Sequence, residues 1–154
     1  DIARWGRRLL DAGAAIVMIK AGSRGMYGAT GSARRLAPLA RSYPGDLTVL
    51  ADQELWEESF KVPKIASTTG AGDSAIAGFL AAYLHGEPFH RMLRYAAAVG
   101  AQNVVTLDAV SGIKSWTETT RMVNRNLPKN RLSITTPGWT YDARAHHWQR
   151  ARRA

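Results

Sequence analysis

The sequence predicts an α/β fold, and three observations lead to this prediction. Apolar residues between positions 2 and 12 recur at helical spacing, which indicates an amphipathic helix. The short apolar run at 14–19 is typical of a buried strand. Residues 74–84 are apolar nearly all round, as expected for a helix buried in a larger core. Helices and a buried strand in one chain indicate helices packed on a sheet.

The first third of the chain is predicted to form a helix, a strand, a turn and a second strand. Gly13 ends the first helix, because glycine is common just past a helix C-terminus. Gly22 and Gly25 interrupt the apolar strand with a turn, and residues 26–29 are expected to return beside it as a hairpin-like pair. The mixed stretch that follows predicts loops with one short strand at 47–50.

Three further helices are predicted in the second half. The glycine-rich turn at 70–72 leads directly into the buried helix. Pro88 opens the next helix, at a position where a missing N–H costs little. Ser115 and Glu118 have the spacing of a capping box, which predicts a third helix running to about residue 125.

Composition and charge limit the class of protein. The chain has 154 residues and no apolar run of the ~18 residues that a membrane span needs, so we expect a cytoplasmic protein without a membrane partner. It has no cysteine, which excludes disulfides and thiol catalysis. The formal charge is +9, but the basic residues are spread along the chain. A basic surface is the favoured interpretation, and a nucleic-acid-binding module is the rival.

The most informative segment is Thr68-Thr69-Gly70-Ala71-Gly72-Asp73, directly before the buried helix. Its glycines let backbone N–H groups approach a ligand, and the helix start adds unpaired N–H groups and partial positive charge. This arrangement favours a phosphate. Asp73 would repel a resting phosphate, but it suits the removal of a proton from an attacking hydroxyl. From spacing alone, helix capping by Asp73 is an equally good interpretation.

The segment 67–73, followed by Ala77-Gly78-Phe79, resembles the second signature of the PfkB carbohydrate kinases, D-T-x-G-A-G-D. The resemblance implies part of a ribokinase-like three-layer α/β/α sandwich with a mostly parallel sheet. It also implies that Asp73 is the general base. The anion hole around the γ-phosphate of ATP would be formed by Gly70, Ala71 and Gly72.

Two other segments also resemble this family. Residues 16–25 are similar to its strand–turn element, T-L-G-x-x-G, which lies beside the nucleotide. Residues 94–112 are similar to the helix and loop beside the adenine. The resemblance assigns six nucleotide-binding residues: Lys20, Gly22, Ser23, Gly25, Ala97 and Asn103.

The cofactors implied are ATP and Mg²⁺, which would arrive bound to the nucleotide, and no protein metal ligands are expected. Ser67 stands where the family usually has Asp, whose carboxylate helps to hold a monovalent cation. Because Ser67 carries no charge, we expect weak or no activation by potassium.

The resemblance divides the chain near residue 126. Residues 1–126 are expected to be the C-terminal nucleotide-binding part of a PfkB-like kinase domain. Residues 127–154, the C-terminal tail, are basic and aromatic, and their role is left open. Glu57 and Glu58 are expected on a solvated face. The first residues look like the middle of a helix and lack Met, so we expect a fragment of a longer chain.

The expected function is ATP-dependent phosphorylation of a sugar or nucleoside hydroxyl. The alternative is a non-catalytic nucleotide-binding fragment that lacks the substrate half. The expected partners are ATP and a small sugar or nucleoside, and a homodimer is left open.

Overall fold

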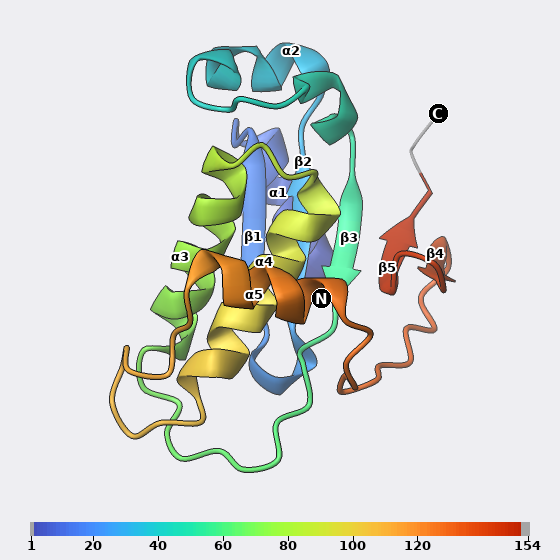
Figure 1. Ribbon diagram of the computed structural model, residues 1–154. Coiled ribbons are helices and arrows are strands. Elements are labelled where there is room, and N and C mark those ends of the chain that lie inside the picture. The colour runs from blue at the N-terminus through green and yellow to red at the C-terminus, as the bar shows by residue number, and fades with distance from the viewer. Residues whose placement is uncertain (1, 152–154) are drawn as a thin grey trace.

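The computed structural model describes residues 2–151 and has an α/β fold, which confirms the predicted class (Figure 1). The helices are α1 (Ile2–Asp11), α2 (Ala33–Leu36), α3 (Ala71–Leu84), α4 (Phe89–Asn103) and α5 (Trp116–Asn124). The strands are β1 (Ile16–Lys20), β2 (Met26–Thr30), β3 (Glu54–Glu57), β4 (Trp139–Asp142) and β5 (His147–Arg150). Short 3-10 helices are η1 (Gly22–Arg24), η2 (Ala37–Arg41) and η3 (Leu47–Leu50).

The five strands form one sheet in the order β1-β2-β3-β5-β4. All four pairings within the described residues are antiparallel, so the prediction of a mostly parallel sheet is wrong. The connectivity gives the physical reason. Parallel neighbours need a crossover helix between them, whereas α3, α4 and α5 all follow β3 and no strand after them returns parallel to it.

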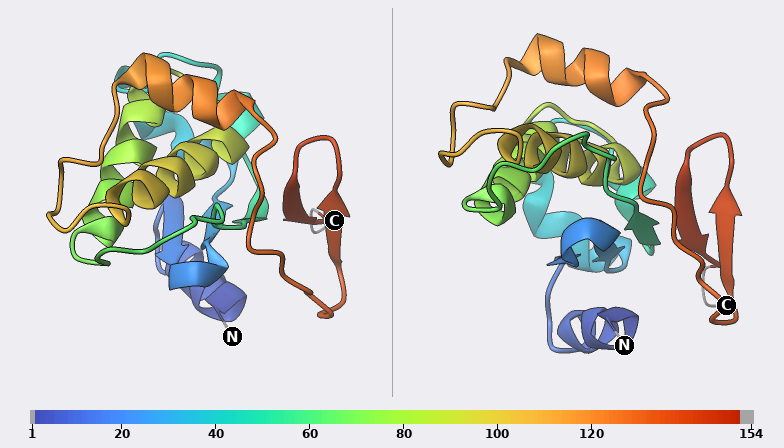
Figure 2. Two further views of the ribbon diagram at one scale, coloured as in Figure 1. Left: turned by 60° about the horizontal axis from the view of Figure 1, so that its bottom comes forward. Right: turned by 90° about the horizontal axis from the view of Figure 1, so that it is seen from below.

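Helices cover both faces of the sheet, so the predicted three-layer arrangement is confirmed (Figure 2). Alternate residues of β2 separate the two faces, as the two-residue period of a strand requires. Tyr27 and Ala29 belong to the small core beneath α1. Met26 belongs to the larger core under α3 and α4. Gly28 lies beneath α4, where an added Cβ would come within 2.8 Å of Leu93, so the helix sits close to the sheet.

The predicted helices agree with the structure. The capping box of α5 is present: the Ser115 hydroxyl accepts from the backbone N–H of Glu118 at 3.3 Å, and the Glu118 carboxylate accepts from that of Ser115 at 3.2 Å. The short strand predicted at 47–50 is wrong. Residues 47–50 form the 3-10 helix η3, capped by Asp46, which accepts from the backbone N–H of Thr48. Among the described residues, no helix is long and apolar enough to cross a membrane.

Glu57 and Glu58 were expected to face solvent, and both are completely buried. They lie at the end of β3, where the C-terminal tail packs against the sheet. The tail contains β4 and β5, and β5 pairs with β3, so the tail extends the sheet by two strands (Figure 1).

Candidate functional site

A cavity of about 570 Å³ lies where the end of β1, the start of β2 and the N-terminus of α3 meet. These three points share the lower end of the molecule in Figure 1. Its volume is within the usual range for sites that take small molecules and cofactors. Its lining includes Lys20, Gly22, Ser23, Gly25, Ser59, Phe60, Val62, Ile65, Ala71, Gly72, Ala97, Ala101 and Asn130.

The turn before α3 is shaped by Gly70. This residue is the N-cap of the helix, with φ of 77°, a left-handed conformation that favours glycine. The Ser67 hydroxyl accepts from the backbone N–H of Thr69 at 3.1 Å, and this bond stabilises the residues just before Gly70. The N-terminus of α3 borders the cavity through Ala71 and Gly72. The N–H of Ala71 donates to the carbonyl of Thr68 at 3.3 Å, whereas the N–H groups of Gly72 and Asp73 have no backbone partner within the described residues and can be offered to an anion.

Lys20 adds a full positive charge to this helix terminus. Its Nζ lies 2.7 Å from the point where a Cβ on Gly72 would stand. Glycine at position 72 therefore allows the ammonium group to approach the backbone of the first turn. A lysine beside a helix N-terminus is an arrangement that binds phosphate groups.

The other part of the cavity is apolar. Its lining includes Phe60, Val62 and Ile65 from the segment after β3, and Ala97 and Ala101 of α4. These residues make up an apolar slot, in which the two alanine side chains take up little space. A flat apolar ligand group fits such a slot, and an anionic group fits the Lys20 end.

Asp73 stands at the third position of α3, in its first turn, and is exposed. The N-cap is Gly70, and no side chain caps this helix, so the capping interpretation of Asp73 finds no support in the contacts. Asp73 does not line the cavity itself. Within residues 2–151, no group of three or more His, Cys, Asp or Glu side chains could hold a metal ion.

The structure brings most of the predicted site residues together. Seven of them line the cavity: Lys20, Gly22, Ser23, Gly25, Ala71, Gly72 and Ala97. Asn103 does not. It is fully buried, its Nδ2 donates to the carbonyl of Ala109 at 2.5 Å, and its Oδ1 has no hydrogen-bond partner among the described residues. Through this hydrogen bond, Asn103 stabilises the loop that follows α4.

Sequence reasoning missed Ser59 and Asn130. Ser59 follows β3, a strand that the sequence analysis did not predict. Asn130 reaches the cavity only because the tail folds back onto the sheet, and no local pattern around it signals this. The antiparallel pairing that places it is described below.

Fold and cavity together define an α/β protein in which a helix N-terminus and a lysine lie beside an apolar slot. Residues 1–116 match the pfkB family carbohydrate kinase model. The chain belongs to this family.

Similar proteins agree with this assignment. The acarbose 7(IV)-phosphotransferase of Actinoplanes sp. (strain ATCC 31044 / CBS 674.73 / SE50/110) is 33% identical over 73 residues, which are 46% of this chain and 24% of that protein. Among solved structures, the nucleoside kinase of Methanocaldococcus jannaschii, an archaeal member of the ribokinase family, has a TM-score of 0.58 at 21% identity over 80% of this chain and 33% of its own. The ribokinase of Arabidopsis thaliana, complexed with ribose and ATP, has a TM-score of 0.61 at 20% identity. The match covers 80% of this chain and 34% of that ribokinase. The chain thus spans about a quarter to a third of the length of these relatives.

Proposed function

We propose that this chain is the nucleotide-binding part of a kinase that transfers the γ-phosphate of ATP to a hydroxyl of a sugar or nucleoside. The observation that supports this most is the Lys20 ammonium group at the N-terminus of α3, at one end of a cavity with an apolar slot. In the proposal, the slot takes the base and the helix terminus takes the phosphates. Residues 1–126 form the nucleotide-binding part of the kinase domain, and the C-terminal tail is appended to it.

The anion hole is the turn Gly70–Gly72 in this proposal. Backbone N–H groups aimed at the moving phosphoryl group stabilise the charge that spreads over its oxygens. Lys20 lies beside the same turn and adds a mobile positive charge. Magnesium, bound to the nucleotide phosphates, would neutralise further charge when present.

Asp73 is the general base in this proposal. It is exposed and stands one residue beyond the anion hole. A carboxylate at that position can accept the proton of an acceptor hydroxyl that attacks the phosphate held by the turn. Its partner substrate would approach from outside the cavity lining, because Asp73 is not part of that lining.

The alternative is a non-catalytic nucleotide-binding fragment. One observation favours it: the chain spans only about a third of the length of the ribokinase-family structures that it resembles. Both proposals predict nucleotide binding, and only the first predicts phosphoryl transfer.

One experiment separates the two. MgATP binding to the 154-residue chain is measured by calorimetry, and release of ADP is then assayed against a panel of sugars and nucleosides, with the chain alone and with a full-length version. Binding with turnover in the full-length protein supports the kinase. Binding without turnover on any acceptor supports the fragment, and no binding overturns both.

A further inference from the structure

The C-terminal tail pairs with the segment that lines the nucleotide cavity. The backbone N–H of Lys61 donates to the carbonyl of Pro128 at 2.8 Å, and the backbone N–H of Asn130 donates to the carbonyl of Ser59 at 2.9 Å. Between them, Phe60 and Lys129 form an isolated antiparallel bridge. The family match ends at residue 116, so this contact is made by a segment outside it.

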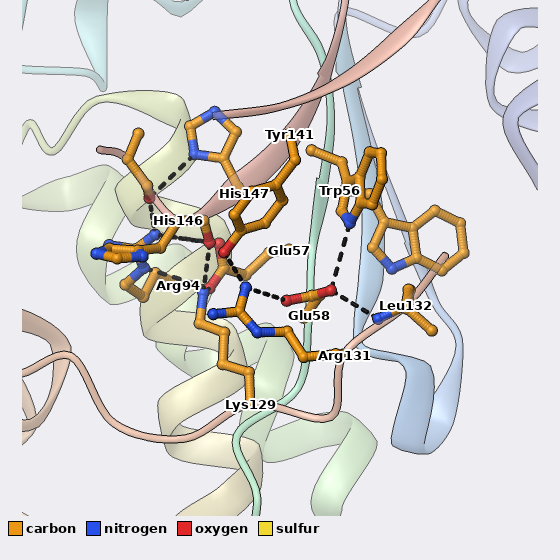
Figure 3. Close-up of polar contacts among 12 residues, drawn as sticks. Trp56, Glu57, Glu58, Arg94, Lys129, Arg131, Leu132, Tyr141, His146 and His147 are labelled. Atoms are coloured by element: carbon orange, nitrogen blue, oxygen red, sulfur yellow. Dashed lines mark hydrogen bonds and ion pairs between the residues drawn. The ribbon is translucent and has the colours of Figure 1, made fainter. Parts of the chain in front are cut away.

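Two buried carboxylates fix the tail in this register (Figure 3). Glu57 accepts from Lys129 Nζ and, at 3.2 Å, from Arg94 Nε. Lys129 Nζ also donates to the carbonyl of His146 at 2.7 Å. The side chains of Glu57 and Lys129 are only 1% and 6% exposed, so while the tail is docked each charge depends on protein partners rather than on water.

Glu58 makes a second anchor. It accepts from the backbone N–H of Leu132 at 2.7 Å and from Trp148 Nε1 at 3.3 Å. The tail is therefore held on both sides of Asn130, by Lys129 before it and by Leu132 after it. A residue held in this way presents its side chain at a fixed position, as a binding contact requires.

Asn130 has unused hydrogen-bonding groups at the cavity. Its Nδ2 donates to the Ser59 hydroxyl at 2.9 Å, and that hydroxyl donates to the carbonyl of Ser23 at 2.5 Å. An asparagine amide offers two N–H donors and one carbonyl acceptor. The second N–H and Oδ1 of Asn130 have no hydrogen bond within residues 2–151, and the residue lines the cavity.

The position of Asn130 across the sheet indicates which part of a ligand it can reach. Lys20 on β1 pairs with Met26 on β2, and Met26 pairs with Glu57 on β3. The tail pairs with the continuation of β3 on its far side. Three strand spacings of about 4.8 Å separate the backbones of Lys20 and Asn130, roughly 14 Å in all. The backbone of Asn130 thus lies beside Phe60, across β2 and β3 from Lys20, while its amide is linked through the Ser59 hydroxyl to the carbonyl of Ser23 in the turn between β1 and β2.

We propose that Asn130 hydrogen-bonds to the nucleoside part of the bound nucleotide, and that the C-terminal tail therefore completes the nucleotide site. This inference rests on the proposed function, because it takes the Lys20 end as the phosphate end. It deepens that function by adding a recognition residue outside the family match. The Ser59 hydroxyl orients the amide, so that Oδ1 and the remaining N–H face the ligand.

The test compares three probes on the 154-residue chain by calorimetry: ATP, adenosine and tripolyphosphate. Asn130→Ala is expected to weaken the binding of ATP and of adenosine by the same factor, roughly 3- to 10-fold, as for one lost hydrogen bond between neutral groups. Tripolyphosphate affinity is expected to stay unchanged. Asn126→Ala is the matched control. Asn126 comes directly before the tail, only four residues from Asn130, but it is exposed and does not line the cavity.

Two results would overturn the inference while leaving the proposed function intact. One is an Asn130→Ala variant that binds ATP as tightly as the unmodified chain does. The other is an equal loss for all three probes with a lower melting temperature, which would give Asn130 a purely structural role. If the unmodified chain binds neither ATP nor adenosine, the proposed nucleotide cavity is itself wrong and the inference falls with it.

Discussion

Replacing either partner of the buried Glu57–Lys129 ion pair should destabilise the protein, and Glu57→Gln should cost more than Lys129→Met. The asymmetry comes from Arg94. Without Lys129, Glu57 keeps its hydrogen bonds to Arg94 at 3.2 and 3.5 Å. In Glu57→Gln the amide oxygen can still accept a hydrogen bond, but the negative charge is gone. Lys129 and the largely buried Arg94 are then two cations facing neutral acceptors: that oxygen and the carbonyls of Ala145 and His146.

The magnitudes follow from burial. Breaking a buried pair so that a charge is left uncompensated costs about 3–5 kcal/mol, which we expect for Glu57→Gln. Lys129→Met removes the hydrogen bond from Lys129 to Glu57 but leaves those from Arg94. Losing one hydrogen bond to a charged group costs about 1.5–3 kcal/mol, which we expect for this variant. In a chain of this size, each kcal/mol lowers the melting temperature by roughly 2–4 °C. Glu57→Gln should therefore melt roughly 6–20 °C lower than the unmodified chain.

Urea unfolding followed by tryptophan fluorescence is a suitable assay, because Trp56 and Trp148 are paired across β3 and β5 next to this cluster. Lys61→Met is the matched control, since Lys61 is exposed and makes no ion pair in the described chain. Burial raises the pKa of Glu57, whereas Lys129 and Arg94 lower it. A cost below about 1 kcal/mol for Glu57→Gln would show that Glu57 is already protonated in the fold, and the reasoning from two uncompensated cations would be refuted.

Four further predictions concern the site and the tail. Asp73→Asn should lower turnover of a full-length version by about two to four decades. It should change the free energy of unfolding by less than about 1 kcal/mol, and near-normal turnover would remove Asp73 as the base. Lys20→Met should weaken ATP binding by roughly 10- to 100-fold and leave adenosine binding unchanged, as measured by calorimetry. Because Ser67 carries no charge, adding potassium to a sodium-free buffer should change the turnover of the full-length enzyme little or not at all. Strong activation would mean that other oxygens bind the cation. Burial lowers the pKa of His147 to about 4. In the unfolded chain the histidine has its ordinary pKa of about 6.5, so between pH 4 and 6.5 the unfolded chain binds more protons than the folded one. The free energy of unfolding should therefore be at its full value above about pH 6.5 and decrease as the pH falls towards 4. Urea midpoints at pH 7 and 5 should show this fall, and His147→Gln should reduce it.

The sequence predicted the parts of the fold whose signals are local. The Ser115–Glu118 capping box, the glycine-rich turn before α3 and the turn between β1 and β2 each depend on a few neighbouring residues, and the structure has all three. Most predicted nucleotide residues lie around one cavity for the same reason, because residues of both turns line it.

What could not be predicted depends on residues far apart in the chain. Adjacent charges such as Glu57 and Glu58 usually face solvent, and they are buried here only because Lys129 and Leu132, more than 70 positions later, supply their partners. The apolar run in β1 does not indicate whether its neighbour is parallel or antiparallel. Asn130 has no signature of its own, and its place follows entirely from the docking of the tail.

The added hairpin also changes where this protein can self-associate. A sheet edge with unpaired N–H and C=O groups is a template for pairing with another chain. β5 covers the outer edge of β3, and the new edge strand, β4, has only four residues and ends at the charged Asp142. β1 has an apolar run and no partner on its outer side within the described residues. If the isolated chain aggregates, the contact should therefore form at β1. A lysine in place of Ile19, which is only partly buried, would test this with light scattering, whereas Val17 is buried and a lysine there would disturb the core.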